Sequence, residues 1–153
     1  MPSFRCDLNP NMIKELLNDI SDSFNKNDLM TLILFVTNRC NLKCYFCCYK
    51  DSLNSSKDLP LSTFEKMARS IPRLKSLLIS GGEPFLREDL FDIISLFVHH
   101  CGARFISIPN NGFFTDRVLA LTQKFLEKEK AAFLTLLFSK LTGRLIIREG
   151  AFP

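Results

Sequence analysis

Residues 31–47 read TLILFVTNRCNLKCYFC, a short apolar run followed directly by a loop that holds three cysteines. The run from Thr31 to Val36 has the length and the branched side chains of a buried parallel strand. The three thiols are therefore expected on the loop at the carboxyl end of that strand. Parallel α/β folds place their chemistry at this end of the sheet.

Cys40, Cys44 and Cys47 are separated by three and then two residues. Three thiolates on one tight loop suit three corners of a cubane iron–sulfur cluster, and they leave the fourth iron open to a substrate or cofactor. A structural zinc site needs four ligands, normally in two separated pairs, and the sequence has no second pair of that kind. A redox dithiol of Cys44 and Cys47 is the other alternative, but Cys40 and the lack of a helix signal directly after the pair argue against it.

Two further motifs follow later apolar runs. Ser80-Gly-Gly-Glu-Pro84 comes after the run from Leu77 to Ile79, and Pro109-Asn-Asn-Gly112 comes after the alternating run from Arg104 to Ile108. Each is a plain turn sequence when taken alone, because Gly and Asn both tolerate positive φ. Their position behind the cysteine loop strengthens a functional interpretation of both.

The three motifs together resemble those of the radical S-adenosylmethionine (SAM) enzymes: C-x3-C-x-aromatic-C, a GGEP motif and an N-G turn. The resemblance covers roughly residues 32–138. It implies a [4Fe–4S] cluster held by Cys40, Cys44 and Cys47, with SAM bound at the open iron. It also implies an enzyme that cleaves SAM reductively, so that a 5'-deoxyadenosyl radical abstracts hydrogen from a substrate that the sequence does not identify.

The same resemblance implies a set of SAM contacts. Phe46 would pack against the adenine, the backbone at Gly81 and Gly82 would approach the methionine amine, and Glu83 would accept a hydrogen bond from that amine. The full set is Phe46, Gly81, Gly82, Glu83, Pro84, Asn111 and Ser139.

Three neighbours of the cluster ligands carry separate expectations. Arg39 and Lys43 are expected to offset part of the negative charge of a cluster. Cys48 is expected to point away from the ligands as a bystander, because adjacent residues of an extended loop face opposite ways.

Helical patterns alternate with the apolar runs, and this alternation predicts parallel βαβ units. A capping box is expected at Ser62–Glu65, a second helix with its stripe from Leu86 to Val98 ends at Gly102, and a third begins with Thr115 as its cap. The predicted fold class is α/β: a partial (β/α) barrel of about four parallel strands with helices on its outer face. It resembles the first half of a radical SAM barrel.

The expected organisation is a helix and linker over 1–30, with the helix at about 11–24, a core over 31–143 and a divergent tail over 144–153. Residues 131–138 fit a helix or a buried strand, and strand is preferred because AFLTLLFS resembles the fourth strand of the family. The sheet is then expected to end near Phe133–Phe138 at an unpaired edge. Such an edge predicts self-association or a partner chain that completes the barrel. The alternative is a truncated, inactive iron–sulfur fragment or partner subunit.

Composition limits the other classes of function. Of 153 residues, 46% are apolar and 24% charged, which suffices for one core, and the net charge of +4 is spread along the chain. No nucleic-acid or membrane partner is expected from this pattern. Six cysteines without a signal-peptide pattern favour a reducing, cytoplasmic setting. The expected partners are SAM, an electron donor and the substrate.

Overall fold

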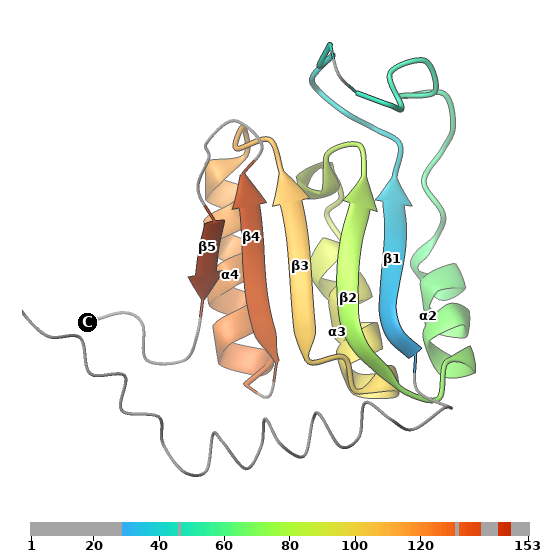
Figure 1. The fold of residues 1–153 in the computed structure, drawn as a ribbon, viewed down its shortest axis with the longest axis vertical. Coiled ribbons are helices and arrows are strands. Elements are labelled where there is room, and N and C mark those ends of the chain that lie inside the picture. Colours follow the sequence, from blue (N-terminus) through green and yellow to red (C-terminus); the bar gives the residue numbers. More distant parts are fainter. Residues whose placement is uncertain (1–28, 46, 131, 139–143, 148–153) are drawn as a thin grey trace, which may run out of the picture.

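The computed structural model describes residues 29–45, 47–130, 132–138 and 144–147 (Figure 1). The helix predicted over 11–24 lies outside these residues. The described chain forms one open sheet whose strands follow one another in chain order. The strands are β1 (Leu29–Thr37), β2 (Leu74–Gly81), β3 (Phe105–Asn110), β4 (Phe133–Phe138) and β5 (Arg144–Ile147).

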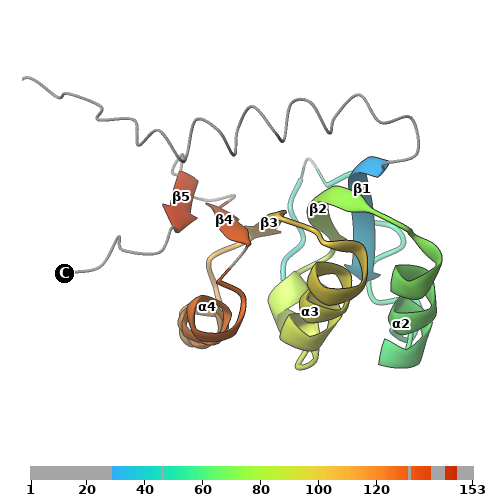
Figure 2. The same ribbon diagram turned by 90° about the horizontal axis from the view of Figure 1, so that it is seen from below.

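The first four strands are parallel, as the βαβ pattern predicted. The α-helices α2 (Leu61–Ser70), α3 (Leu90–Cys101) and α4 (Thr115–Lys128) connect them and lie on one face of the sheet (Figure 2). A 3-10 turn, η1 (Pro84–Leu86), stands between β2 and α3. The predicted α/β fold, a partial barrel with helices on one side, is therefore confirmed, and the sheet is not closed.

The core lies between the sheet and the three helices. Alternate residues of each strand face the helices, since successive strand side chains point to opposite faces of a sheet. The buried strand residues on this face are Leu34, Val36, Leu77, Ile79, Ile106, Ile108, Leu134 and Leu136, and the buried helix residues include Phe64, Ala68, Ile93, Ile94, Phe97, Val118, Leu121 and Phe125.

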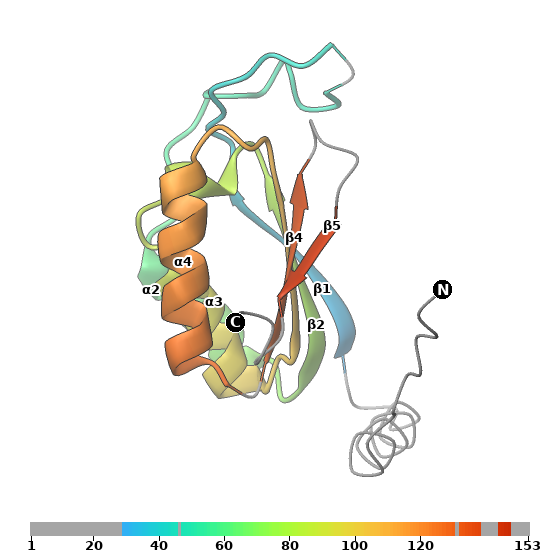
Figure 3. The same ribbon diagram turned by 90° about the vertical axis from the view of Figure 1, so that its left-hand side faces the viewer.

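The opposite face of the sheet carries apolar side chains that the described residues leave open to solvent. Ile33 is 54% exposed, Phe35 47% and Phe105 37%. The stacked rings of Phe105 and Phe133 join β3 to β4 on this face, with their centroids 5.5 Å apart. Figure 3 shows the helices on the far side of the strands from it. This is the face that would line the interior of a completed barrel.

Two helices begin earlier in the chain than their predicted N-caps, Ser62 and Thr115. Pro60, not Ser62, is the N-cap of α2, and Phe114, not Thr115, is the N-cap of α4; neither makes a side-chain cap bond. The carbonyls of Pro60 and Phe114 accept the first-turn N–H bonds, so the hydroxyl residues fall inside the helices. The predicted end of α3 at Gly102 is confirmed, with φ of 67° at that residue.

The outer edge of β4 is paired, which corrects the expectation of an unpaired edge there. Residues 133–138 do form the predicted strand, but β5 pairs with it in the antiparallel sense through four residue pairs. An antiparallel neighbour needs only a short connection, whereas another parallel strand would need a crossover of a dozen residues or more. The short tail therefore suffices to cover this edge.

None of the helices among the described residues is long and apolar enough to cross a membrane.

Phe97 is expected to contribute strongly to stability, because its ring is fully buried between α3 and the sheet. Phe97→Ala should lower the free energy of unfolding by about 3–5 kcal/mol in urea titrations, through lost burial and the cavity left behind. Leu119→Ala is the matched control on the exposed side of α4, where Leu119 is 56% exposed, and it should change stability by less than about 0.5 kcal/mol. Equal losses in the two variants would contradict this placement of the core.

Candidate functional site

Three loops meet at the carboxyl edge of the sheet, each directly after one of the first three strands (Figure 1). The cysteine loop follows β1, the Gly-Gly-Glu turn follows β2 and the Asn-Asn-Gly turn follows β3. They line one pocket of about 270 Å³, formed by Cys40, Leu42, Cys44, Cys47, Cys48, Leu53, Gly81, Gly82, Glu83, Pro109, Asn110 and Asn111. The structure thus brings together the three motifs that the sequence placed on separate strands.

The three predicted ligand cysteines carry free, half-buried thiols. A turn closes the second half of their loop, since the N–H of Cys47 donates to the carbonyl of Cys44 at 3.1 Å. The N–H of Leu42 donates to the sulfur of Cys40 at 3.4 Å. Free thiols on a polar, partly open loop are the donor set that an iron–sulfur cluster takes.

Cys48 lines the same pocket as the three ligand candidates, but it is exposed whereas they are half-buried. The chain does not run extended here, because the N–H of Lys50 returns to the carbonyl of Cys47 at 3.4 Å. In a turn, unlike a strand, neighbouring side chains can face the same way.

Among the described residues, no three Cys, His, Asp or Glu side chains come together in the spacing of a formed metal site. The thiols thus surround one pocket without converging on a common centre. The donor chemistry fits an iron–sulfur cluster.

The start of the cysteine loop is fixed to the Gly-Gly-Glu turn by two backbone hydrogen bonds. The N–H of Gly82 donates to the carbonyl of Thr37 at 2.9 Å, and the N–H of Glu83 donates to the carbonyl of Arg39 at 2.8 Å. Both glycines are needed for this contact. A Cβ on Gly81 would overlap the carbonyl oxygen of Thr37, and one on Gly82 would overlap that of Arg39. Gly81 also has φ of 122°, which L side chains rarely adopt.

Glu83 is buried and joins two of the three loops. One carboxylate oxygen accepts the N–H of Phe85 at 3.1 Å, and the other accepts the N–H of Asn111 at 2.8 Å. Burial raises the pKa of Glu83, and these two hydrogen bonds offset part of the rise. The carboxylate predicted to contact SAM therefore also holds the second and third motifs together.

Asn111 extends this connection to the first motif. Its amide nitrogen donates to the side-chain oxygen of Asn41 at 2.8 Å, and its own oxygen accepts the N–H of Phe113 at 3.0 Å. Gly112, with φ of 73°, completes the turn. Glu83 and Asn111 form a chain of hydrogen bonds from the Gly-Gly-Glu turn to the cysteine loop. Pro84 is buried and starts η1 directly after Glu83.

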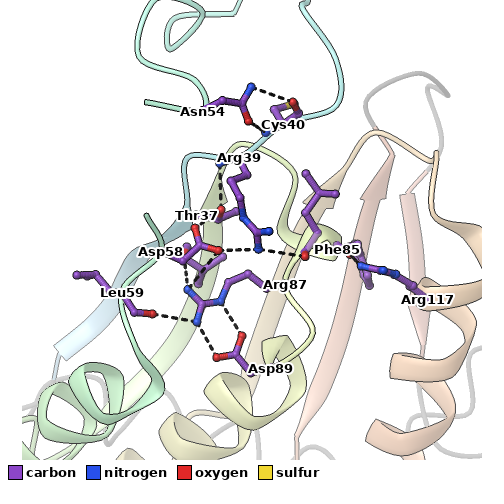
Figure 4. A network of polar contacts seen from close by, with 12 residues as sticks. Thr37, Arg39, Cys40, Asn54, Asp58, Leu59, Phe85, Arg87, Asp89 and Arg117 are labelled. Atoms are coloured by element: carbon purple, nitrogen blue, oxygen red, sulfur yellow. Dashed lines mark hydrogen bonds and ion pairs between the residues drawn. The ribbon is translucent and has the colours of Figure 1, made fainter. Parts of the chain in front are cut away.

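Arg87, which no sequence pattern indicated, is the most connected side chain near the site (Figure 4). It is 6% exposed and donates to the carbonyls of Val36 at 2.8 Å and Leu59 at 3.0 Å. Two further bonds run to the carboxylate of Asp89, at 2.8 and 2.6 Å, and these lower the pKa of Asp89. Arg87 thereby fixes the end of β1, the segment before α2 and the start of α3 to one another.

Arg39, which was expected to offset part of the charge of a cluster, is paired with a carboxylate of the protein. Its guanidinium lies 2.6 Å from Asp58 and donates to the carbonyl of Leu86 at 3.2 Å. Thr37 also donates to Asp58, at 2.6 Å. Asp58 supplies the negative charge that Arg39 pairs with. Lys43 is exposed on the cysteine loop.

Two of the predicted SAM contacts, Phe46 and Ser139, lie outside the described residues.

A family model described as the radical SAM superfamily matches residues 34–136. The match runs from within β1 to within β4 and includes the three loops of the pocket. The chain therefore belongs to the radical SAM superfamily, and membership implies a [4Fe–4S] cluster and SAM as cofactors.

Several curated proteins are similar to the chain over much of its length. A probable GTP 3',8-cyclase of Methanothermobacter thermautotrophicus is 34% identical over 125 residues, which are 79% of this chain and 40% of that protein. Molybdenum cofactor biosynthesis protein 1 of Bos taurus is 31% identical over 110 residues, or 69% of this chain and 17% of that protein. The chain thus spans less than half the length of these two relatives.

Gly82→Ala is expected to disturb the cysteine loop itself, because the new Cβ would press on the Arg39 carbonyl and lie 3.1 Å from the Cβ of Cys40. The overpacked variant should lose about 1–3 kcal/mol of unfolding free energy and should retain less iron after anaerobic reconstitution. Gly102→Ala is the control, since nothing lies within 4 Å of its added Cβ; it should cost stability through its positive φ alone and keep its iron. Full iron retention by Gly82→Ala would contradict the close contact.

Glu83 should impose a pH dependence on stability. Its raised pKa means that the folded chain binds this proton more tightly than the unfolded chain. The contribution of Glu83 to stability is therefore full below its ordinary pKa of 4.5. It is lost as pH rises through the raised pKa of Glu83 in the folded chain. The stability difference between the parent and Glu83→Gln should thus fall as pH rises above the ordinary pKa of 4.5 in urea titrations.

Glu65→Gln provides the opposite control. A hydrogen bond from Arg69 lowers the pKa of the exposed Glu65, so its small contribution is present above its ordinary pKa and is lost as pH falls. A difference for Glu83→Gln that grows with pH would contradict the assigned cause.

Proposed function

We propose that this chain is the cofactor-binding part of a radical SAM enzyme, with Cys40, Cys44 and Cys47 as ligands of one [4Fe–4S] cluster. The observation that carries the proposal is the pocket at the carboxyl edge of the sheet. Three free thiols line it together with Gly82, Glu83 and the turn after β3. When bound, the cluster supplies the electron that cleaves SAM reductively and yields a 5'-deoxyadenosyl radical.

The protein residues would then bind and orient SAM. The proposed contacts are Phe46, Gly81, Gly82, Glu83, Pro84, Asn111 and Ser139. Glu83 suits the positively charged methionine amine, because its two oxygens offer about four acceptor sites and two are used by backbone N–H groups. A negative carboxylate in a buried position attracts a cation more strongly than one in water.

The substrate proposed for a first test is GTP, because relatives of this chain carry the name GTP 3',8-cyclase. The chain covers 40% of the length of the first of them, so a partner chain or a further segment would have to supply the rest of a substrate pocket. The exposed apolar face at Ile33, Phe35 and Phe105 supports this view, since such a face is normally covered. The alternative is an iron–sulfur fragment or partner subunit without catalysis of its own.

Iron retention and SAM cleavage separate these possibilities. Anaerobic reconstitution should give four irons per chain, and Cys40→Ala, Cys44→Ala or Cys47→Ala should each abolish the cluster. Cys48→Ala is the matched control in the same pocket and should retain it. Zinc bound stoichiometrically in place of iron would refute the proposal.

With SAM and a strong reductant, an active chain should release 5'-deoxyadenosine, and the fragment should release none. Light scattering after gel filtration, run beside this assay, should show self-association, because the apolar face of the sheet is exposed. A clean monomer that turns over SAM steadily would contradict the need for a completing chain.

A further inference from the structure

The side chain of Asn54 contacts the backbone of Cys40 at two points (Figure 4). Its oxygen accepts the N–H of Cys40 at 3.1 Å, and its amide nitrogen donates to the carbonyl of Cys40 at 3.2 Å. The two residues are 14 positions apart. One amide side chain thus binds both polar groups of a single residue, as a neighbouring strand would.

Asn54 is itself held in place. Its backbone N–H donates to the carbonyl of Asn38 at 3.0 Å, and its φ of 59° places it in the left-handed region that Asn tolerates. It is the one described non-glycine residue with positive φ. The backbone conformation of Asn54 therefore helps to fix the direction of its side chain toward Cys40.

A second set of bonds fixes the loop that carries Asn54. The amide nitrogen of Asn38 lies at 3.1 Å from the Ser52 carbonyl, 3.1 Å from the Ser55 hydroxyl and 2.9 Å from the Ser56 hydroxyl. The hydroxyl of Ser55 donates to the Ser52 carbonyl at 2.6 Å. Residues 52–56 are therefore tied to the end of β1, and their position does not depend on a bound metal.

We propose that Asn54 is a positioning residue for the first cluster ligand. With its N–H and carbonyl both bound, the backbone of Cys40 cannot rotate freely, so the Cα–Cβ bond that carries its thiol keeps one direction. This inference rests on the proposed function, because it assumes that Cys40 holds iron. Removal of a group that orients a metal ligand normally lowers metal affinity by about 10- to 100-fold.

Asn54→Gly is the sharpest test, because glycine keeps the positive φ and removes only the two side-chain bonds. Ser52→Ala is the matched control in the same loop: it removes the hydroxyl bond to the Tyr49 carbonyl and leaves the Ser52 carbonyl for Asn38. All three proteins would be reconstituted anaerobically. The rate of iron loss to a chelator and the electron paramagnetic resonance spectrum of the reduced protein would then be measured.

Iron loss from Asn54→Gly should be roughly 10-fold faster than from the parent, with a shifted or broadened spectrum, while Ser52→Ala matches the parent. The metal-free form of Asn54→Gly should have the same unfolding free energy as the parent within about 1 kcal/mol. Parent-like iron loss and spectrum in Asn54→Gly would overturn the inference alone. An unfolded metal-free variant would also overturn it, by making Asn54 a general stability residue. A parent protein that holds no iron would refute the proposed function as well.

Discussion

The site depends on one close backbone contact, between residues 37–39 after β1 and residues 81–83 after β2. Two N–H groups of the Gly-Gly-Glu turn donate to the carbonyls of Thr37 and Arg39, and neither glycine has room for a Cβ. These bonds extend the pairing of β1 with β2 beyond the strand ends. Cys40, the first of the proposed cluster ligands, therefore starts from a position that the sheet sets, and a larger residue at either glycine would move the two motifs apart.

Buried polar groups stabilise this contact between the ends of β1 and β2. Arg87 holds the end of β1 and the start of α3, and the Glu83–Asn111 pair holds the β3 turn against the cysteine loop. Each of these groups is hydrogen-bonded, as burial requires, because an unpaired polar group would cost several kcal/mol. The cysteine loop is different: its sulfurs line a pocket without forming a compact metal site among the described residues. The contact between the strand ends therefore fixes where the cysteine loop begins, at Cys40.

Much of this could be predicted from the sequence. Apolar runs indicated the first three strands, period-3.6 stripes indicated the helices, and the resemblance to the family decided for the fourth strand. The motif order placed the cysteines, Glu83 and Asn111 at the same edge of the sheet. Local patterns did not reveal Arg87 or Asn54, because their partners lie 51 and 14 residues away along the chain. The pairing of β5 with β4 was missed for a different reason, because residues 144–147 lie in the tail beyond the part of the chain that resembles the family. The cap errors at Ser62 and Thr115 have another cause: α2 and α4 begin earlier than expected, with Pro60 and Phe114 as N-caps, so both hydroxyl residues lie inside the helices.

The central claim is that three thiols hold a four-iron cluster whose remaining iron is open to SAM. The most direct measurement is the electron paramagnetic resonance spectrum of the reduced, reconstituted chain, recorded with and without SAM. We expect a four-iron signal whose g values shift when SAM is added, because SAM then binds the iron that has no cysteine. A four-iron signal that SAM leaves unchanged would contradict this claim and would indicate a fourth protein ligand, for which Cys48 in the same pocket is the candidate.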